Sequence, residues 1–180
     1  MILPRVIGLS GLAHAGKSTA ARWLRDDHGY HILPFAFRLK QMASTILTYD
    51  QLHSRMKEVP DPLLGGKTPR QFMQLLGTEF GRQLISDTLW VDLWLRDVRR
   101  MPDVARIVAD DVRFANEATA IRSLGGIIIE ISRDGAGSAS GGDHVSETLA
   151  VEPDFRVHAN TIEEQTTALM DLARHPSMLV

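Results

Sequence analysis

The stretch that most constrains this chain lies near its N-terminus, where residues 11–18 have the sequence GLAHAGKS. This sequence matches G-x-x-x-x-G-K-S/T, the P-loop pattern. Residues 5–10 before it are apolar enough for a buried parallel strand, and residues 18–25 after it favour a helix. In that arrangement, glycines turn backbone N–H groups toward a phosphate, and the helix N-terminus adds its dipole. The sequence therefore predicts a nucleotide-binding site rather than an incidental glycine turn before a lysine.

Two side chains of this loop are expected to act on the nucleotide. A lysine at the position of Lys17 reaches the β- and γ-phosphates, and a hydroxyl at the position of Ser18 ligates Mg²⁺. His14 occupies a variable position and is expected to be a solvated loop residue rather than a catalyst. We expect ATP to contact Gly11, Ala13, His14, Ala15, Gly16, Lys17, Ser18 and Thr19.

Composition disfavours several other classes of protein. With 180 residues, the chain is long enough for one domain with a substantial core. The formal net charge of −2 disfavours a dedicated nucleic-acid binder, and the lack of cysteine excludes disulfides, thiolate metal sites and a thiol nucleophile. No apolar run approaches the length of a membrane span, and the N-terminus does not resemble a signal peptide. We therefore expect a cytoplasmic protein with no membrane partner.

The rest of the chain alternates predicted strands and helices. Apolar runs predict further strands at residues 31–35, 105–111, 126–131 and 155–159. Pro34 ends the first of these or confines it to a sheet edge. Asn116 is expected to cap a helix that stops at Gly125, and Thr161 with Glu164 forms a capping box for a last helix. This alternation predicts an α/β fold with a five-stranded parallel sheet flanked by helices.

Two segments depart from the alternation. Residues 36–103 contain no convincing strand and predict a helical insertion, while residues 133–150 are glycine-rich and predict a mobile lid. The core then comprises residues 1–35, 104–132 and 151–180.

Within the insertion, Thr68 and Gln71 form a capping box with Pro69 at the first helical position, and Thr78 is expected to cap a continuation after a break at Gly77. Six large side chains are expected in the core rather than as base-stacking platforms: Phe72, Leu75, Leu76, Phe80, Trp90 and Trp94.

Charged residues follow the predicted strands. Asp110 and Asp111 lie at the carboxyl end of the third strand, where open parallel sheets bind ligands. One of them, with Asp111 favoured, is expected to hold Mg²⁺ or substrate, the alternative being an aspartate that caps the turn. Arg113 projects toward the same mouth. Arg133 begins the lid, where its charge can close over the phosphates.

The insertion carries a second polar set. Arg70 and Gln74 are four residues apart and share one helix face. Gly77 continues that face and would let a ligand approach closely, whereas Arg82 lies farther around the helix. For each arginine, a solvated surface position is the alternative.

Together these pieces resemble the P-loop nucleoside monophosphate kinases, and among them the phage-type deoxynucleoside monophosphate kinase family. The resemblance spans nearly the whole chain and is carried by residues 11–18, 68–71 and 111–117, with Gln74, Gly77, Glu79 and Arg82. Gly125-Gly126 and residues 144–147 are further landmarks.

The resemblance implies a helical acceptor-binding insertion, a lid over ATP, and transfer of the γ-phosphoryl group of ATP to a dNMP. The residues themselves lead us to expect Mg²⁺ on Ser18 and Asp111, and catalytic roles for Lys17, Arg113 and Arg133. The acceptor site that the resemblance implies comprises Arg70, Gln74, Arg82, Asp111 and Arg113, and the shared helix face adds Gly77. The lid departs from the family in its few basic residues. A homodimer is left open, as is a host cytoplasmic location for a phage-encoded protein.

Two functions other than dNMP phosphorylation are alternatives for a P-loop protein of this kind. A dNMP phosphate is already a nucleophile near neutral pH, so positioning and charge neutralisation suffice. A P-loop kinase of another metabolite such as dephospho-coenzyme A has an alcohol acceptor and needs a base, for which Asp111 is a candidate. A GTPase or nucleotide switch is disfavoured because the chain lacks an Asn-Lys-x-Asp motif.

Overall fold

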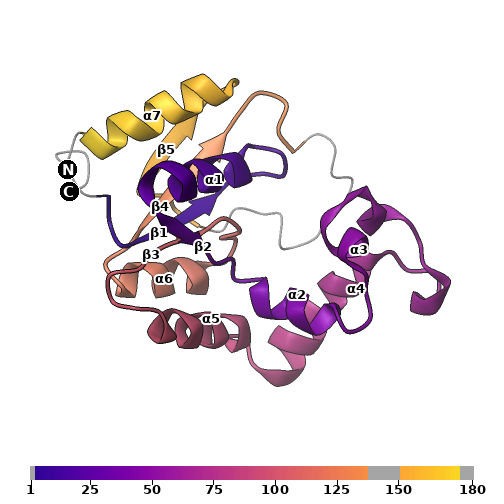
Figure 1. Ribbon diagram of the computed structural model, residues 1–180. Helices are drawn as coiled ribbons and strands as arrows, with labels where there is room; N and C mark the ends of the chain where they lie inside the picture. The colour runs from indigo at the N-terminus through magenta and orange to yellow at the C-terminus, as the bar shows by residue number, and fades with distance from the viewer. Residues whose placement is uncertain (1–2, 138–150, 175–180) are drawn as a thin grey trace. The chain divides into compact units, whose positions relative to one another are not determined.

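The computed structural model describes residues 3–137 and 151–174 of the chain (Figure 1). These residues form two compact units, one of residues 3–34 with 98–137 and 151–174, and the other of residues 35–97. Among the described residues, no helix combines the length and the apolar character that a membrane crossing requires.

The first unit is built on a five-stranded sheet in the order β2-β3-β1-β4-β5, with every neighbouring pair parallel. Its strands are β1 (Val6–Ser10), β2 (Tyr30–Ile32), β3 (Arg106–Ala109), β4 (Ile127–Ser132) and β5 (Phe155–His158). The predicted fold class and the edge position of β2 are confirmed. The central place of β1 brings the loop after it to the middle of the carboxyl edge, where ligands bind in such sheets.

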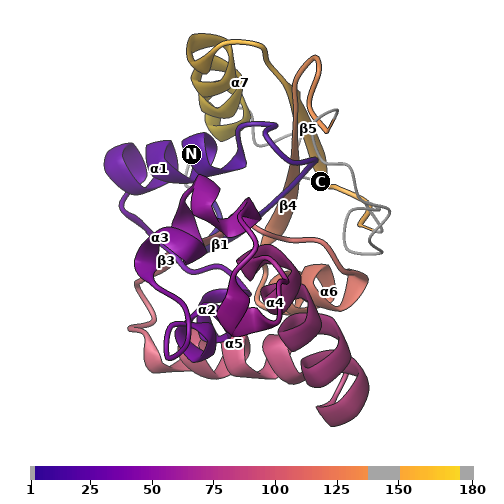
Figure 2. The same ribbon diagram turned by 90° about the vertical axis from the view of Figure 1, so that its right-hand side faces the viewer.

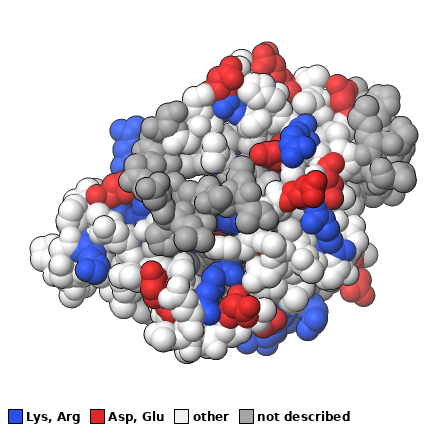
Figure 3. Space-filling model, turned by 180° about the vertical axis from the view of Figure 1, so that it is seen from behind, with Lys and Arg blue, Asp and Glu red and all other residues white. Residues whose placement is uncertain are grey.

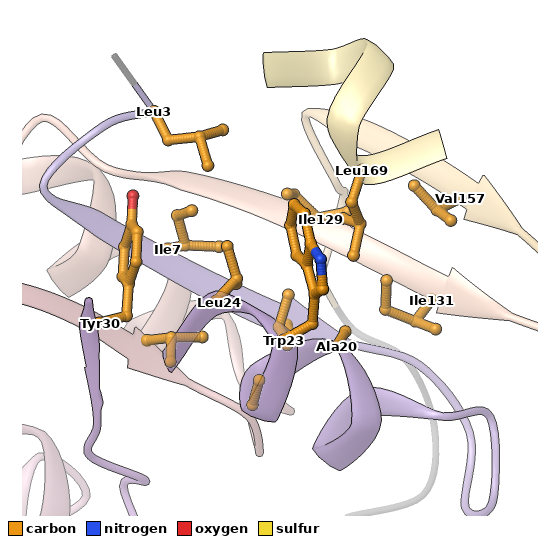
Figure 4. Close-up of a cluster of buried hydrophobic side chains, with 13 residues drawn as sticks. Leu3, Ile7, Ala20, Trp23, Leu24, Tyr30, Ile129, Ile131, Val157 and Leu169 are labelled. Atoms are coloured by element: carbon orange, nitrogen blue, oxygen red, sulfur yellow. The ribbon is translucent and has the colours of Figure 1, made fainter. Parts of the chain in front are cut away.

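Helices cover both faces of this sheet. Helices α1 (Lys17–His28) and α7 (Ile162–Arg174) lie on one side, and α6 (Ala115–Ser123) lies on the other (Figures 1 and 2). The main core lies between the sheet and the first two helices (Figure 4). There, Ile7 of β1 and Ile129 of β4 pack with Trp23 and Leu24 of α1 and with Leu169 of α7. Burial of these apolar faces fixes α1, and with it the end of the P-loop, against the sheet.

The cap of α6 differs from the prediction. The helix begins at Ala115, so Asn116 lies inside its first turn and the prediction of Asn116 as the cap is wrong. The Glu117 carboxylate instead accepts hydrogen bonds from the backbone N–H groups of Arg113 at 2.8 Å and Phe114 at 3.1 Å. An acidic side chain at the third helical position can satisfy these otherwise unpaired donors, and here it does so while buried.

The other predicted helix ends of this unit are confirmed. Gly125 has a φ of +70° and its N–H donates to the Arg122 carbonyl, which ends α6. Thr161 and Glu164 form the expected capping box, with the Glu164 N–H donating to the Thr161 hydroxyl at 3.1 Å. Acidic and basic side chains are interspersed on the face shown in Figure 3.

The second unit is helical throughout, as expected for the insertion. It contains α2 (Phe37–Ala43), α3 (Tyr49–His53), α4 (Pro69–Leu75), the 3₁₀ turns η1 (Arg55–Glu58) and η2 (Pro62–Leu64), the π-helix η3 (Leu76–Ile85), and most of α5 (Leu89–Arg100). The capping box of Thr68 and Gln71 at the start of α4 is confirmed. A small core of Ala43, Leu47 and Leu52 packs with partly buried side chains that include Phe72 and Leu76.

The end of α4 departs from the prediction. The chain continues directly into η3, and no side chain caps its start, so the predictions of a break at Gly77 and of Thr78 as a cap are wrong. Trp90 and Trp94 are buried as expected, whereas Leu75 and Phe80 are exposed, which contradicts their predicted place in the core. Phe80 lies in η3, where the wider turn of a π-helix shifts side chains around the axis, so a spacing of 3.6 residues assigns it to the wrong side. Leu75 is the last residue of α4, and its exposure has no such explanation.

Candidate nucleotide-binding site

The loop between β1 and α1 has the backbone conformation that its glycines were expected to permit. Gly11 has a φ of +134° and Gly16 a φ of +100°, values that L side chains rarely adopt. A Cβ on Gly11 would overlap the carbonyl oxygen of Ile131, and one on Gly16 would lie 2.7 Å from Nε2 of Gln165. His14 is exposed and has a φ of +64°, which makes it the one non-glycine residue with positive φ in the described part of the chain.

The Lys17 side chain folds back over this loop. Its Nζ donates to the carbonyl oxygens of Gly11 and Leu12, at 2.7 Å in each case. Burial is the main cause that lowers the pKa of Lys17 from 10.5 to about 8, and the positive charge of Arg113 lowers it further. The carboxylates of Asp110 and Asp111 act in the opposite direction. The ammonium therefore lies partly buried near charges of both signs, in a setting that favours a compensating anion.

Ser18 is paired with the first of the two aspartates. Its Oγ donates to Oδ2 of Asp110 at 3.0 Å. Strand β3 ends at Ala109, two residues before the predicted end, so both carboxylates follow the strand directly. The sequence analysis favoured Asp111 as the metal ligand, whereas the contact to Ser18 is made by Asp110.

The oxygen pair of Ser18 and Asp110 fits a magnesium ion. Mg²⁺ prefers hard oxygen ligands, and in phosphoryl-transfer sites it binds through one or two protein groups together with substrate phosphates and water. A serine hydroxyl and a carboxylate within hydrogen-bond distance are such a pair, since one ion could take a lone pair from each oxygen while the hydroxyl keeps its proton.

Arg113 is the third charged group of this region. Its side chain is exposed, and its backbone is fixed by the hydrogen bond to Glu117. Because its charge acts on the pKa of Lys17, the guanidinium lies near the loop. The first unit therefore brings together Lys17, Ser18, Asp110, Asp111 and Arg113, which come from two separate stretches of sequence.

The start of the predicted lid also returns to the loop. Arg133 follows β4 and is exposed. Four residues later, the N–H of Gly137 donates to the carbonyl of Ala13 at 3.1 Å. A Cβ on Gly137 would lie 2.9 Å from the Leu12 side chain. The remainder of the predicted lid, residues 138–150, lies outside the described residues.

The predicted acceptor residues of the insertion lie in the second unit. Arg70 contacts Glu58: its Nε donates to Oε1 at 2.7 Å and its Nη2 lies 2.6 Å from the same oxygen. The hydrogen bond from Arg70 is the main cause that holds the pKa of Glu58 below its usual value. Gln74 is partly buried on the same helix, and Nη1 of Arg82 donates to the Asp87 carbonyl at 3.0 Å. Gly77 lies in η3, within contact of Leu39.

Two residues near these groups were not anticipated. Glu58 orients Arg70, and Gln165 of α7 is buried against Gly16. Nothing local marks either one, because each meets its partner through tertiary packing. Asp110, in contrast, could have been found from its position directly after the strand.

Comparisons with known proteins agree with one another. A model of the family "Deoxynucleotide monophosphate kinase" matches residues 65–157. The "Putative deoxynucleotide monophosphate kinase" of Acanthamoeba polyphaga mimivirus is 36% identical over 156 residues, which cover 79% of this chain and 80% of that protein. The deoxynucleoside-5'-monophosphate kinase of Escherichia phage T5 is 43% identical over 56 residues, 31% of this chain and 22% of that protein.

A solved structure shares the fold. The crystal structure of TT1252 from Thermus thermophilus superposes with a TM-score of 0.54 and covers 96% of this chain and 97% of its own. Because the sequence identity is 16%, this likeness concerns the fold alone.

Proposed function

The chain belongs to the deoxynucleotide monophosphate kinase family, and we propose that it transfers the γ-phosphoryl group of ATP to a dNMP, giving ADP and a dNDP. The protein is accordingly an enzyme of the phosphotransferase class. The observation that carries the proposal is the group of Lys17, Ser18 and Asp110 around a glycine loop whose backbone is shaped for phosphate. Phosphoryl transfer needs little more from a protein than positioning and charge neutralisation.

We infer that Lys17 exchanges its partners when ATP binds. In the structure its ammonium donates hydrogen bonds to two carbonyl oxygens of the loop itself. A β- or γ-phosphate oxygen offers a full negative charge, which makes a stronger hydrogen bond than a neutral carbonyl. The phosphate charge also raises the pKa of Lys17 and so keeps it protonated during transfer.

We infer that Ser18 and Asp110 hold Mg²⁺ beside the same phosphates. The ion, when bound, neutralises charge on the β- and γ-phosphate oxygens. Asp111 and Arg113 lie close enough to act on Lys17, and we propose that they face the acceptor, with Arg113 offering a guanidinium to phosphate oxygens.

The insertion is proposed to position the acceptor. Arg70 presents a guanidinium whose orientation is fixed by Glu58 along its Nε side. A planar guanidinium binds phosphate through two parallel N–H bonds, so fixing its plane reduces the ordering that binding requires. Gln74, Gly77 and Arg82 complete the proposed set. A cytoplasmic location, a homodimer and the covering role of Arg133 stay predictions.

No finding favours the alternative alcohol acceptor, for which a general base would be needed. A dNMP supplies its own nucleophile, a phosphate oxygen that carries negative charge at neutral pH. The two acceptors therefore differ in what they demand of Asp111, and direct assay separates them.

The test is an assay of purified protein with ATP, Mg²⁺ and each common dNMP, with ADP and dNDP measured by ion-exchange chromatography. A reaction without acceptor measures ATP hydrolysis, and dephospho-coenzyme A serves as the alternative acceptor. We expect Lys17→Ala to abolish transfer while its circular dichroism spectrum stays that of the parent. Absence of turnover with every dNMP would refute the proposed function.

A further inference from the structure

The π-helix η3 is held on one side by Trp90. The indole Nε1 donates to the carbonyl of Gly77 at 2.8 Å. One turn later, a Cβ on Gly81 would lie 2.6 Å from atoms of the same ring, so only glycine fits there without displacing the ring. Trp90 is 4% exposed and therefore fixes both glycines from within the second unit. π-Helical turns are rare and often occur at functional sites.

Glu79 lies midway between these two glycines. Because Gly77 and Gly81 both contact the indole ring, a residue two positions from each projects from the other side of the helix, away from Trp90. The Glu79 side chain is partly buried, and its Oε2 is shielded from solvent with no hydrogen-bond partner in the described part of the chain.

A shielded carboxylate oxygen without a donor is unusual. Native structures pair nearly all buried polar atoms, because leaving one unpaired gives up its hydration without return. Such an atom is retained where a ligand supplies the missing donor. The residues around it support this interpretation, since the same helical stretch carries Arg70, Gln74 and Arg82, the proposed acceptor residues.

We propose that the Glu79 carboxylate accepts a hydrogen bond from the nucleoside part of the acceptor. This inference rests on the proposed function and adds a residue that recognises the base or sugar of the acceptor in addition to its phosphate. The phosphate itself is excluded as the partner of Glu79, because two anions repel and a phosphate oxygen offers no proton. The remaining donors of a dNMP are its 3′-hydroxyl and the N–H groups of its base.

The positions of Arg70 and Glu79 along the chain agree with the binding of a phosphate by the first and of a nucleoside by the second. Arg70 lies in the first turn of α4 and Glu79 lies nine residues later in η3, so the two residues are separated along consecutive helical segments. Both side chains are long enough to shorten this span from either end. The cation is thus suited to the phosphate end of a mononucleotide and the carboxylate to its nucleoside end.

The test compares Glu79→Gln and Glu79→Ala with the parent protein. We expect Glu79→Ala to raise the acceptor KM about 10- to 100-fold, and Glu79→Gln to raise it less, with the KM for ATP unchanged. The melting temperature of Glu79→Ala without nucleotide should equal or exceed that of the parent, because this variant removes an unpaired buried oxygen. A structural role would lower it. Asp50→Asn, which alters an exposed carboxylate of the same unit, is the matched control and should change neither value.

Acceptor analogues identify the donor. If it is the 3′-hydroxyl, the difference between parent and Glu79→Ala disappears with 2′,3′-dideoxynucleoside monophosphates. If it is a base N–H, the difference persists with them and varies from base to base. An unchanged acceptor KM, or an equal loss with every base and every dideoxy analogue, would overturn the inference. Failure of the parent protein to phosphorylate any dNMP would instead refute the proposed function.

Discussion

Lys17 should impose an alkaline limit on the use of ATP. The free protein holds this ammonium in a largely buried position beside Arg113, which together bring its pKa to about 8. Only the protonated side chain can pair with a triphosphate, so kcat/KM for ATP should follow the protonated fraction of free enzyme. That fraction is about nine tenths at pH 7 and about one tenth at pH 9, and kcat/KM should therefore fall about tenfold between them.

The assay measures initial rates at low ATP, a saturating dNMP and constant ionic strength from pH 7 to pH 9.5. The last ionisation of a phosphate group has a pKa near 6, so the phosphates of both substrates are about nine tenths ionised at pH 7 and contribute little above it. At saturating ATP the limit should move to higher pH, because bound phosphate raises the pKa of Lys17.

Lys17→Arg supplies the control. A guanidinium stays charged throughout the range, so the variant should lose activity through its changed geometry but show no fall centred on pH 8. A parent profile that stays level to pH 9.5, or a variant profile with the same fall as the parent, would refute the assignment of this limit to Lys17.

Two further predictions concern the ligands of Mg²⁺ and of the acceptor. Asp110→Asn should lower kcat about 100-fold or more and raise the Mg²⁺ concentration that gives the half-maximal rate, whereas Asp111→Asn should leave that concentration near its parent value. If Mg²⁺ titrations show the reverse, Asp111 is the metal ligand. Arg70→Ala should raise the dNMP KM about tenfold or more with the ATP KM unchanged, and Glu58→Gln should do so to a smaller extent; an unchanged dNMP KM in steady-state assays would make Arg70 a surface residue.

The fold could be predicted because its signals are local. A short apolar run indicates a buried strand from its own composition. Capping residues such as Thr68 and Thr161 fix the start of a helix through hydrogen bonds within its first turn. Because Pro34 lacks an N–H, it predicted that the second strand lies at a sheet edge or ends there; β2 lies at the edge and ends at Ile32. None of these inferences required knowing what the segment packs against.

The identity of the carboxylate beside Ser18 was harder to predict for a geometric reason. Successive residues of an extended strand point to opposite faces, so the end of the strand decides which of two adjacent aspartates meets a given neighbour. The apolar run predicts that the third strand extends to Asp111, whereas β3 ends at Ala109 and Asp110 contacts Ser18. Whether the carboxylate beside Ser18 is also the metal ligand stays a prediction, which the Mg²⁺ titrations of Asp110→Asn and Asp111→Asn test.

The π-helix illustrates signals that are not local. Gly77 was interpreted as a break because glycine weakens an α-helix, but the chain continues through it with hydrogen bonds five residues apart. What stabilises the wider turn is Trp90, thirteen residues away in sequence, which contacts both Gly77 and Gly81. A pattern of 3.6 residues cannot express such a contact.

The P-loop combines both kinds of information. Its glycines are recognised from the motif alone, yet the reasons for them lie elsewhere in the chain. A side chain on Gly11 would overlap the carbonyl oxygen of Ile131 in β4. A side chain on Gly16 would press against the buried Gln165 of α7. The loop therefore takes its curved shape from the sheet and helix that pack against it. Because those contacts come from the chain itself, we expect ATP binding to exchange the two carbonyl partners of Lys17 for phosphate oxygens rather than to order the backbone.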